Sequence, residues 1–409
     1  MKQMCAAIRR FLMAGALTSI LALAATAQTE SVLYSFTGAN DGASPQEGLT
    51  PDGKGNYFAV AIGGGSGNAG VVFELSPNSS GGWTEQVIYN FTGYTNFSDG
   101  ARPSSTLVFD SKGNLYGVTE GGGVSGSTGG AGTVFELTPN SNGTWAEKIL
   151  YSFAGGTDAW GPLDQGLAID SAGNLYGTTF VGGAYGYGAV YELVAGAGGT
   201  WTEKVLYSFK GLNDGAAPFA SPLVLDSAGN LYGAAWQGGA HDYGVVYELS
   251  RGSGGVWTQK VLCSFPGGSG GESPVGSLTF DSAGNLYGTA VYVAFELVHG
   301  STGTWTRKIL HRFTGGTDGA NPLAGMVFDK AGNLYGMTST GGAHRGIVYE
   351  LTPAANGTWT EKILHRFASN GTDGYGPTYS NVTIDASGNV FGIAGGGSTG
   401  AGVIFEIKP

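Results

Sequence analysis

The chain has 409 residues, of which 77 are glycine and only 12% are charged, and its formal net charge at pH 7 is −11. This acidity, without any Lys/Arg-rich run, argues against nucleic acids and anionic membrane surfaces as partners. Abundant glycine, 12% aromatic residues and no 3.6-residue hydrophobic periodicity beyond the N-terminal segment favour an all-β protein.

The first 27 residues have the pattern of a secretory signal peptide. A basic start precedes an apolar run over residues 11–25, and residues 25–27 form an A-x-A cleavage pattern. We therefore expect a mature chain of residues 28–409 that is secreted or extracellular, or held in the periplasm. Only Cys263 remains after cleavage, so no disulfide framework can form. No second long apolar segment follows, and we expect no membrane span.

One motif, Asp170-Ser-Ala-Gly-Asn-Leu-Tyr-Gly177, returns along the whole mature chain at intervals of 48 to 60 residues. Such spacing indicates one structural unit used seven times. The Asp carboxylate can cap a tight turn, and the Gly can take the left-handed position of a three-residue hairpin loop. A calcium loop would use the same oxygens, but so short a turn offers three ligands at most, so we interpret the motif as structural. The copies begin at Asp52, Asp110, Asp170, Asp226, Asp281, Asp329 and Asp385.

Each repeat contains four β-like runs joined by glycine-rich segments. Four short strands in each of seven repeats predict a seven-bladed β-propeller of four-stranded antiparallel blades. A β-solenoid would need shorter rungs, and a β-sandwich would not show sevenfold self-similarity. The runs are clearest at 166–170, 174–180, 188–193 and 201–209. We expect one propeller domain over residues 28–409, with blades at about 45–91, 100–153, 159–209, 216–265, 272–313, 320–367 and 376–409.

The two ends of the chain predict how the ring closes. The Trp-Thr-Glu-Lys start of the fourth strand occurs six times, but its Leu-Tyr-Ser-Phe end occurs seven times, and the extra copy is Leu33–Phe36. The last repeat stops after its third strand, Val403–Ile407. We therefore expect residues 28–36 to supply the closing strand of blade seven, which removes an open sheet edge.

The repeat resembles the GloVer tandem-repeat family of exported bacterial proteins, in which a Leu-Tyr-Gly-Thr-Thr segment, a Gly-Gly loop and a Gly-Thr-Val-Phe-Glu-Leu segment recur. Matching segments include residues 115–119 and 132–137, and six further copies cover nearly the whole mature chain. The resemblance implies a secreted or surface-attached, propeller-like protein and no known reaction. Many members add a C-terminal sorting anchor. Because this chain ends at Pro409, soon after its last strand, we expect a released protein.

Two acids recur around the predicted ring. A glutamate in every third strand could form a cation ring, but a residue present in every blade usually serves something that every blade has. Lysines on the neighbouring strand could pair with it. An aspartate between blades, followed by Gly and often Pro, is typical of turn chemistry, with a shared ion role as the alternative. The glutamates are Glu74, Glu136, Glu192, Glu248, Glu296, Glu350 and Glu406, and the aspartates are Asp41, Asp99, Asp158, Asp214, Asp318 and Asp373.

Function is expected where the copies differ, and they differ most in the loops that join the second and third strands. Aromatic side chains with a few polar groups gather in these loops in blades three and four, which suits a sugar ring or a partner chain. Alternatively, the rings only pack over the glycine-rich loops, together with Trp160 and Phe219 on the inter-blade segments. Blade five has almost no such loop. The predicted ligand-binding residues are Phe180, Tyr185, Tyr187, Trp236, Gln237, His241, Asp242 and Tyr243.

Catalytic and metal sites have weaker support in the sequence. Glu120 and Asp164 depart from the repeat, and such a carboxylate pair could run glycoside chemistry. We expect that they do not share a pocket, and we assign no catalytic residue. His241 and His344 have no ligand cluster around them, so we expect no metal and no cofactor. A basic rim patch of His311, Arg312, His365 and Arg366 could dock a partner or be solvated variation.

These observations favour a monomeric, secreted binding module that recognises a polysaccharide or protein partner through its variable face. A propeller-type polysaccharide lyase or glycoside hydrolase, acting at the channel mouth, is the first alternative. A structural cell-surface repeat protein is the second.

Overall fold

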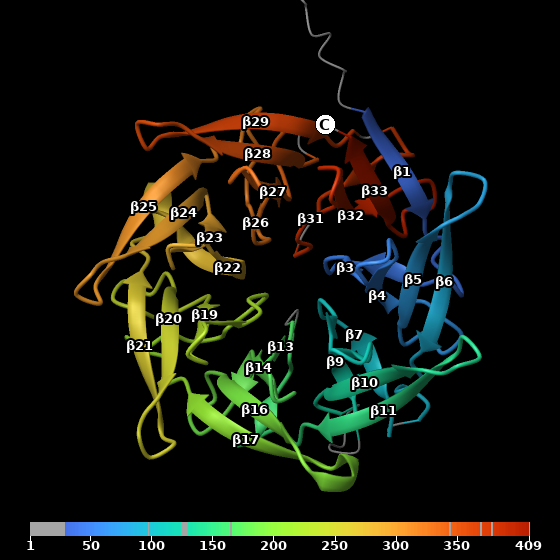
Figure 1. Ribbon diagram of the computed structural model, residues 1–409, viewed down its shortest axis with the longest axis horizontal. Helices are drawn as coiled ribbons and strands as arrows, with labels where there is room; N and C mark the ends of the chain where they lie inside the picture. Colours follow the sequence, from blue (N-terminus) through green and yellow to red (C-terminus); the bar gives the residue numbers. More distant parts are fainter. Residues whose placement is uncertain are drawn as a thin grey trace, which may run out of the picture.

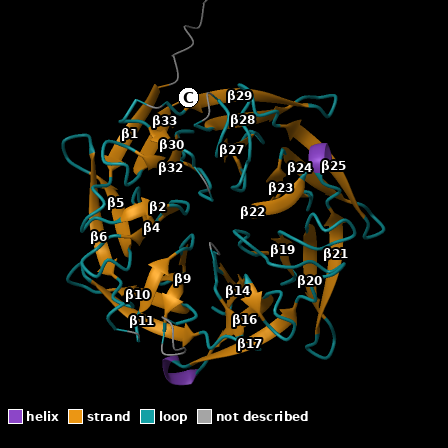
Figure 2. Ribbon diagram, turned by 180° about the vertical axis from the view of Figure 1, so that it is seen from behind, coloured by secondary structure: helices purple, strands orange, loops and turns teal. Residues whose placement is uncertain are grey.

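The computed structural model describes residues 29–96, 98–123, 130–163, 166–342, 345–368, 370–377 and 379–408. These residues form a ring of seven antiparallel blades around a central axis (Figure 1). The helices among them are two one-turn 3-10 helices, η1 (Ala197–Gly199) and η2 (Gly268–Gly270), both at the rim (Figure 2). The predicted all-β, seven-bladed propeller is confirmed. No helix in the described part of the chain is long and apolar enough to cross a membrane.

The blades follow one another around the ring in chain order, and the strands of each blade run from the axis to the rim (Figure 1). Blade one holds β2 (Ala43–Pro45), β3 (Thr50–Pro51), β4 (Tyr57–Gly63), β5 (Val71–Pro77) and β6 (Trp83–Asn90). Blade two holds β7 (Gly100–Pro103), β8 (Val108–Phe109), β9 (Leu115–Gly122), β10 (Thr133–Pro139) and β11 (Trp145–Ser152). Blade three holds β12 (Ala159–Trp160), β13 (Ala168–Ile169), β14 (Leu175–Thr179), β15 (Val181–Gly182), β16 (Ala189–Ala195) and β17 (Trp201–Ser208).

The remaining blades repeat this plan. Blade four holds β18 (Val224–Leu225), β19 (Leu231–Ala235), β20 (Val245–Arg251) and β21 (Trp257–Ser264). Blade five holds β22 (Glu272–Phe280), β23 (Leu286–Val291), β24 (Val293–His299) and β25 (Trp305–Arg312), and blade six holds β26 (Val327–Phe328), β27 (Leu334–Thr338), β28 (Ile347–Pro353) and β29 (Trp359–Arg366). Blade seven holds β30 (Gly374–Tyr375), β31 (Thr383–Ile384), β32 (Val390–Gly396), β33 (Val403–Lys408) and β1 (Thr29–Ser35).

The N-terminal strand closes the ring, as predicted. β1 pairs antiparallel with β33 from Thr29 opposite Lys408 to Ser35 opposite Val403. The C-terminus accordingly lies next to β1 in Figure 1. Phe36, directly after β1, is fully buried and donates its N–H to the carbonyl of Gly402 at 3.0 Å. The first and last parts of the chain therefore share one sheet, and neither leaves an open edge there.

The recurring Asp motif forms the hairpin that the sequence predicts. In blade three, Asp170 Oδ1 accepts the N–H groups of Ala172 and Asn174, each at 2.9 Å. Its Oδ2 accepts the side-chain amide of Asn174 at 2.9 Å. Gly173 has a φ of +85°, which a residue with a Cβ avoids. Both carboxylate oxygens therefore accept hydrogen bonds within the turn, which supports the structural interpretation of the motif.

The innermost strand of blade three is shorter than the sequence predicts. β13 spans Ala168–Ile169 instead of residues 166–170. In neighbouring blades a serine hydroxyl replaces a backbone carbonyl in the ladder: Ser105 Oγ accepts the N–H of Val118 at 2.9 Å, and Ser221 Oγ accepts that of Ala234 at 3.1 Å. The alternation of apolar and polar residues in the sequence cannot reveal this change, because a serine hydroxyl takes the place of a backbone carbonyl as the acceptor for the second strand.

A buried aromatic pair holds each blade to the next. The Phe at the end of one outer strand meets a Phe or Tyr in the third strand of the following blade, mostly edge to face, as Phe153 meets Tyr191 with ring centroids 5.2 Å apart. Tyr191 lies opposite Gly177 on β14, where any side chain would clash with the ring. This explains the Gly of the Leu-Tyr-Gly motif. The other pairs are Phe36–Phe73, Phe91–Phe135, Phe209–Tyr247, Phe265–Phe295, Phe313–Tyr349 and Phe367–Phe405.

Replacing Tyr191 by Phe is expected to raise the free energy of unfolding by about 1 kcal/mol, because a buried hydroxyl without a partner costs desolvation energy. The Tyr191 hydroxyl is buried, and the described residues offer it no hydrogen bond. Blade two has Phe135 at the same place, so Phe135→Tyr should lower stability by a similar amount. Urea unfolding of both variants measures this. A less stable Tyr191→Phe variant would show instead that a buried water satisfies the hydroxyl.

The glutamates of the third strands are bonded within their blades. Glu192 lies opposite Lys204 in the register, and their charged atoms are 3.7 Å apart. Tyr176 donates its hydroxyl to Glu192 Oε1 at 3.0 Å. Ion pairs of the same kind join Glu296 to Lys308 and Glu350 to Lys362. These contacts favour the structural interpretation over a cation ring.

Candidate functional site

The variable loops and the inter-blade segments lie side by side on one face of the ring. In blade three, β12 of the inter-blade segment pairs with β15 of the loop, with Ala159 opposite Gly182. In blade four, Ala216 forms the equivalent bridge with Gln237. The Asp turns lie at the opposite ends of the same strands. The aromatic residues predicted for ligand binding therefore come from segments that share one face.

A cluster of four aromatic rings crosses the mouth of the channel on this face. The ring of Phe219 lies 5.7 Å from Phe180, 5.6 Å from Trp236 and 5.1 Å from Tyr379, measured between centroids. Phe180 belongs to blade three, Phe219 and Trp236 to blade four, and Tyr379 to blade seven. Blades four and seven are not neighbours, so the Phe219–Tyr379 contact spans the axis. We call these residues the mouth cluster.

Tyr379 was missed in the sequence. It lies six residues before Asp385, and the equivalent position in the other six repeats has Gln46, Ser104, Asp164, Ala220, Val275 or Leu323. An aromatic residue at only one of seven equivalent positions is therefore the signal that could have found it. Its partner could not have been found, because nothing in the sequence says which ring faces it across the axis.

The tyrosines of the predicted site lie outside the mouth cluster and are half-exposed. Tyr187 covers Gly211 of the next inter-blade segment so closely that a Cβ there would come within 2.6 Å of its ring. Tyr243 covers Gly267 in the same way, at 2.5 Å. Tyr185 is the most open of the three, with 57% of its surface exposed. Packing over glycine thus accounts for one side of Tyr187 and Tyr243, and the other side remains accessible.

The polar members of the predicted site differ in what they contact. Asp242 Oδ1 accepts the N–H of Gly238 at 3.0 Å, and Asp242 itself has a φ of +63°, so its carboxylate stabilises the loop. Gln237 and His241 are exposed, and the backbone of Gln237 is held by Ala216. Gln237 and His241 can therefore turn toward a ligand, whereas Asp242 already has a structural partner.

The carboxylate pair considered for catalysis is only half described. Glu120 on β9 forms an ion pair with Arg102 on β7, with Oε2 2.7 Å from Nε. The Glu120 side chain is 14% exposed, and this short, charge-assisted hydrogen bond from Arg102 fixes its position. Asp164 lies outside the described residues, as does His344. The expectation that Glu120 and Asp164 share no pocket stays a prediction.

The histidines of the expected basic rim patch face inward. His365 is half-buried, and its Nε2 lies 3.2 Å from Asp373 Oδ2. His311 packs edge to face against Phe313 and points toward Asp318, with 3.8 Å between Nε2 and Oδ2. Arg312 and Arg366 remain exposed. Consecutive residues of a strand point to opposite faces, so each histidine faces inward and its neighbouring arginine faces the rim.

Buried acid pairs lie between neighbouring blades and were not predicted. Between blades two and three, Tyr151 donates its hydroxyl to Asp158 Oδ2 at 3.1 Å, and Glu203 comes close to the same aspartate from β17. Burial and the negative charge of Asp158 raise the pKa of Glu203 to about 7. The same causes raise the pKa of Glu85, Glu147 and Glu361 to about 7 at three other interfaces.

The model of the Gloeobacter/Verrucomicrobia repeat family matches residues 15–158 and 124–294 of the chain. The solved structure of a streptogramin B lyase has a TM-score of 0.56 and 16% identity, over 93% of this chain and 97% of that one. Virginiamycin B lyase from Staphylococcus aureus has a TM-score of 0.55 and 14% identity, over 93% and 99%. Such identities show the shared propeller fold alone. None of the curated proteins matches the chain.

Proposed function

Because the chain belongs to the Gloeobacter/Verrucomicrobia repeat family, we propose that it is an exported propeller that binds a polysaccharide or a protein partner through the aromatic face of blades three and four. The observation that carries the proposal is that half-exposed tyrosines lie in the same two loops as Phe180 and Trp236 of the mouth cluster. Aromatic faces beside exposed polar groups suit the apolar faces and hydroxyls of sugar rings. Gln237 and His241 supply such polar groups at the same loops.

Two further observations support parts of this proposal. Residues 1–27 have the pattern of a signal peptide, which supports a secreted or extracellular protein. Glu120, the described member of the carboxylate pair, is held by Arg102. This ion pair occupies a carboxylate oxygen that a general acid or base would turn toward a substrate, which supports our preference for binding.

The exposed tyrosines and the half-buried Trp236 allow binding to be tested separately from packing. We expect a glycan array to identify a polysaccharide that the purified protein retains, and the double variant Tyr185→Ala, Tyr243→Ala to bind it more than roughly tenfold more weakly. Each ring contributes about 1 kcal/mol beyond burial, and 1.4 kcal/mol corresponds to a factor of about ten. The melting temperature should change little, because both rings are at least 43% exposed.

Tyr94 offers a matched control, since it is 48% exposed and belongs to the segment between blades one and two. Tyr94→Ala should leave the affinity unchanged. Trp236→Ala should lower the melting temperature, because Trp236 is half-buried against Phe219. A large thermal loss with unchanged affinity in the tyrosine double variant would mean that these rings only pack. If the wild type retains no polysaccharide, the carbohydrate part of the proposal is wrong.

A further inference from the structure

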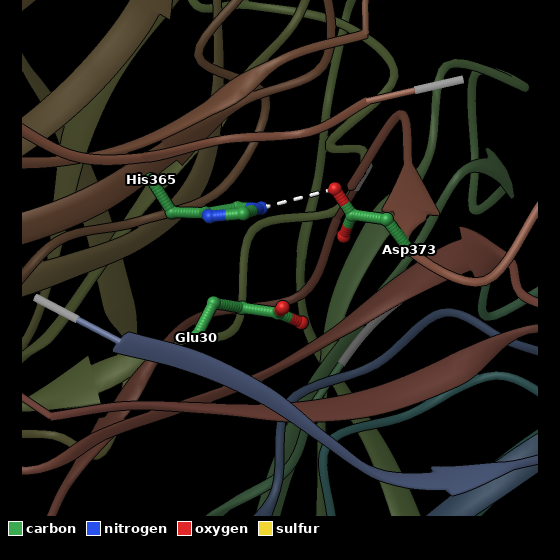
Figure 3. A group of neighbouring side chains, drawn as sticks. All are labelled: Glu30, His365 and Asp373. Atoms are coloured by element: carbon green, nitrogen blue, oxygen red, sulfur yellow. Dashed lines mark hydrogen bonds and ion pairs between the residues drawn. The ribbon is translucent and has the colours of Figure 1, made fainter. Parts of the chain in front are cut away.

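Three side chains from separate parts of the chain converge where blades six and seven meet (Figure 3). Glu30 comes from the closing strand β1, His365 from β29, and Asp373 directly precedes β30. One potential ligand atom from each lies within 4.8 Å of the other two. His365 Nε2 and Asp373 Oδ2 are 3.2 Å apart. Two ligands of a tetrahedral ion with bonds of about 2.0–2.1 Å are about 3.3 Å apart, so this distance suits neighbouring ligands as well as a hydrogen bond.

Two carboxylate oxygens in this group are buried, and no described residue donates a hydrogen bond to them. Asp373 is 6% exposed, and its Oδ2 accepts the N–H of Ala368 at 2.7 Å in addition to its contact with His365. Its Oδ1 has no partner, and neither has Glu30 Oε1. Burying carboxylate oxygens without partners costs energy unless a proton or a cation compensates them. A cation between the two carboxylates would do so.

The equivalent interface between blades two and three satisfies its aspartate without a cation, although Glu203 Oε1, like Glu30 Oε1, has no donor among the described residues. There the residue at the position of His365 is Tyr151, whose hydroxyl donates to Asp158 Oδ2 at 3.1 Å. The N–H groups of Ala154 and Ala159 donate to Oδ2 and Oδ1 of Asp158, at 2.7 and 2.8 Å. Both aspartate oxygens therefore have donors. At the interface of blades six and seven, an imidazole nitrogen replaces the phenol, and one aspartate oxygen is left over.

The second interface that contains a histidine lacks this free oxygen. His311 Nε2 is 3.8 Å from both Asp318 Oδ2 and Glu361 Oε1. Thr314 donates its hydroxyl to Asp318 Oδ1 at 2.7 Å and its N–H to Oδ2 at 2.9 Å. A metal ion here would have to displace existing bonds of the aspartate. Glu361 Oε1, like Glu30 Oε1, is buried without a donor among the described residues. The two interfaces thus differ in the aspartate, which has a free oxygen only beside His365.

We propose that Glu30, His365 and Asp373 bind one divalent transition-metal ion of the zinc class. One imidazole nitrogen and two carboxylate oxygens form a ligand set that zinc accepts, with water completing four-coordination. Calcium prefers six to eight oxygen ligands and magnesium an octahedron of oxygens, so neither fits this group. The side chain of His365 is 18% exposed, which leaves a route from solvent.

The location of Glu30 gives the ion a structural effect. Glu30 lies on β1 and pairs with Ile407 in β33, whereas His365 and Asp373 belong to the junction of blades six and seven. A bound ion would join the closing strand to that junction through coordinate bonds. It would therefore stabilise the closed ring against opening at its N-terminal strand.

The test is thermal unfolding of the purified protein, first stripped with EDTA, with and without ZnCl2. We expect zinc in large excess over its Kd to raise the melting temperature by about 3 °C or more, as a ligand bound only to the folded state does. Calorimetric titration should show one strongly bound zinc ion per chain, and CaCl2 should produce no shift. Cobalt(II) should give the visible absorption of a four-coordinate site.

Two substitutions by the residue of other blades serve as a matched pair. His365→Tyr should fold, because tyrosine fills this position at four other interfaces, and should lose the zinc shift and the cobalt spectrum. His311→Tyr should retain both. Glu30→Gln provides a second loss-of-binding variant. The proposal is overturned if zinc does not stabilise the wild type, if His365→Tyr and Glu30→Gln keep the shift, or if His311→Tyr alone removes it.

Discussion

Deletion of residues 29–36 is expected to open the ring and lower the free energy of unfolding by several kcal/mol. The deletion removes the whole backbone ladder between β1 and β33 and the buried ring of Phe36, which packs against Phe73 with centroids 5.1 Å apart. Loss of a buried Phe side chain alone typically costs about 3–5 kcal/mol. Thermal and urea unfolding of the truncated protein measure the effect.

A circular permutation gives the matched control for this deletion. Thr29 lies opposite Lys408 in the antiparallel pair, so a short turn can lead from the end of β33 directly into β1. Moving residues 29–36 behind Lys408 through such a turn keeps every strand in place and should restore most of the lost stability. A truncated protein that melts at the temperature of the intact one would contradict the closure, whatever the permuted chain does.

The sequence predicts the ring because repetition reveals the unit and counting reveals the closure. Seven Asp turns fix the number of blades, and the surplus Leu33–Phe36 segment identifies the strand that completes the last one. Both inferences depend on residues that do the same task in each copy. The strand register then places Glu192 opposite Lys204 without further information. Local repetition is therefore sufficient for the fold.

The site depends on contacts between copies, which repetition does not reveal. Phe219 meets Tyr379 only because blades four and seven face each other across the axis. A closing strand likewise brings Glu30 to His365 from the other end of the chain. Tyr379 and His365 differ from the residues at the same position in most other repeats, but their partners become visible only when the ring is built.

The interface between blades four and five shows such a hidden relationship. Cys263 stands where other blades have Tyr or His, Gly270 where they have Asp, and Arg307 where they have Glu or Gln. Arg307 instead lies over the ring of Phe265, 4.9 Å from its centroid. A Cβ on Gly270 would come within 3.7 Å of an Arg307 nitrogen. All three positions change together because they meet in space, although they lie in different strands and turns.

The acid pairs at the other interfaces lead to the second large effect, a loss of stability as the pH rises through 7. Burial, followed by repulsion from Asp41, Asp99 and Asp158, raises the pKa of Glu85, Glu147 and Glu203 from the ordinary 4.5 to about 7. The folded state thus binds more protons than the unfolded state between these values. The contribution of these glutamates to the free energy of unfolding is complete below about pH 4.5. It falls as the pH rises, until the glutamates of the folded state have ionised above about pH 7.

The neighbours of each glutamate decide how large its contribution is. Asp158, Tyr151 and Tyr191 face Glu203, and none of them supplies positive charge. Arg366 lowers the pKa of Glu361 in part, although burial and Asp318 still raise it to about 7. In the acid direction, hydrogen bonds hold the pKa of Asp170 and Asp329 below the usual range, so their stabilisation is lost as the pH falls through those lowered values. Maximum stability is therefore expected near pH 4–5.

The measurement is the melting temperature at pH 5 and at pH 8 in constant ionic strength, and we expect the value at pH 5 to be higher by several degrees. Blade four supplies the control substitution, because Gln259 occupies the glutamate position there and donates its amide to the carbonyl of Asp214 at 2.9 Å. The triple variant Glu85→Gln, Glu147→Gln, Glu203→Gln should therefore fold and show a much smaller difference between the two pH values. If the wild type is equally stable at pH 5 and pH 8, or if the triple variant keeps the full difference, the buried glutamates do not hold protons at the blade interfaces.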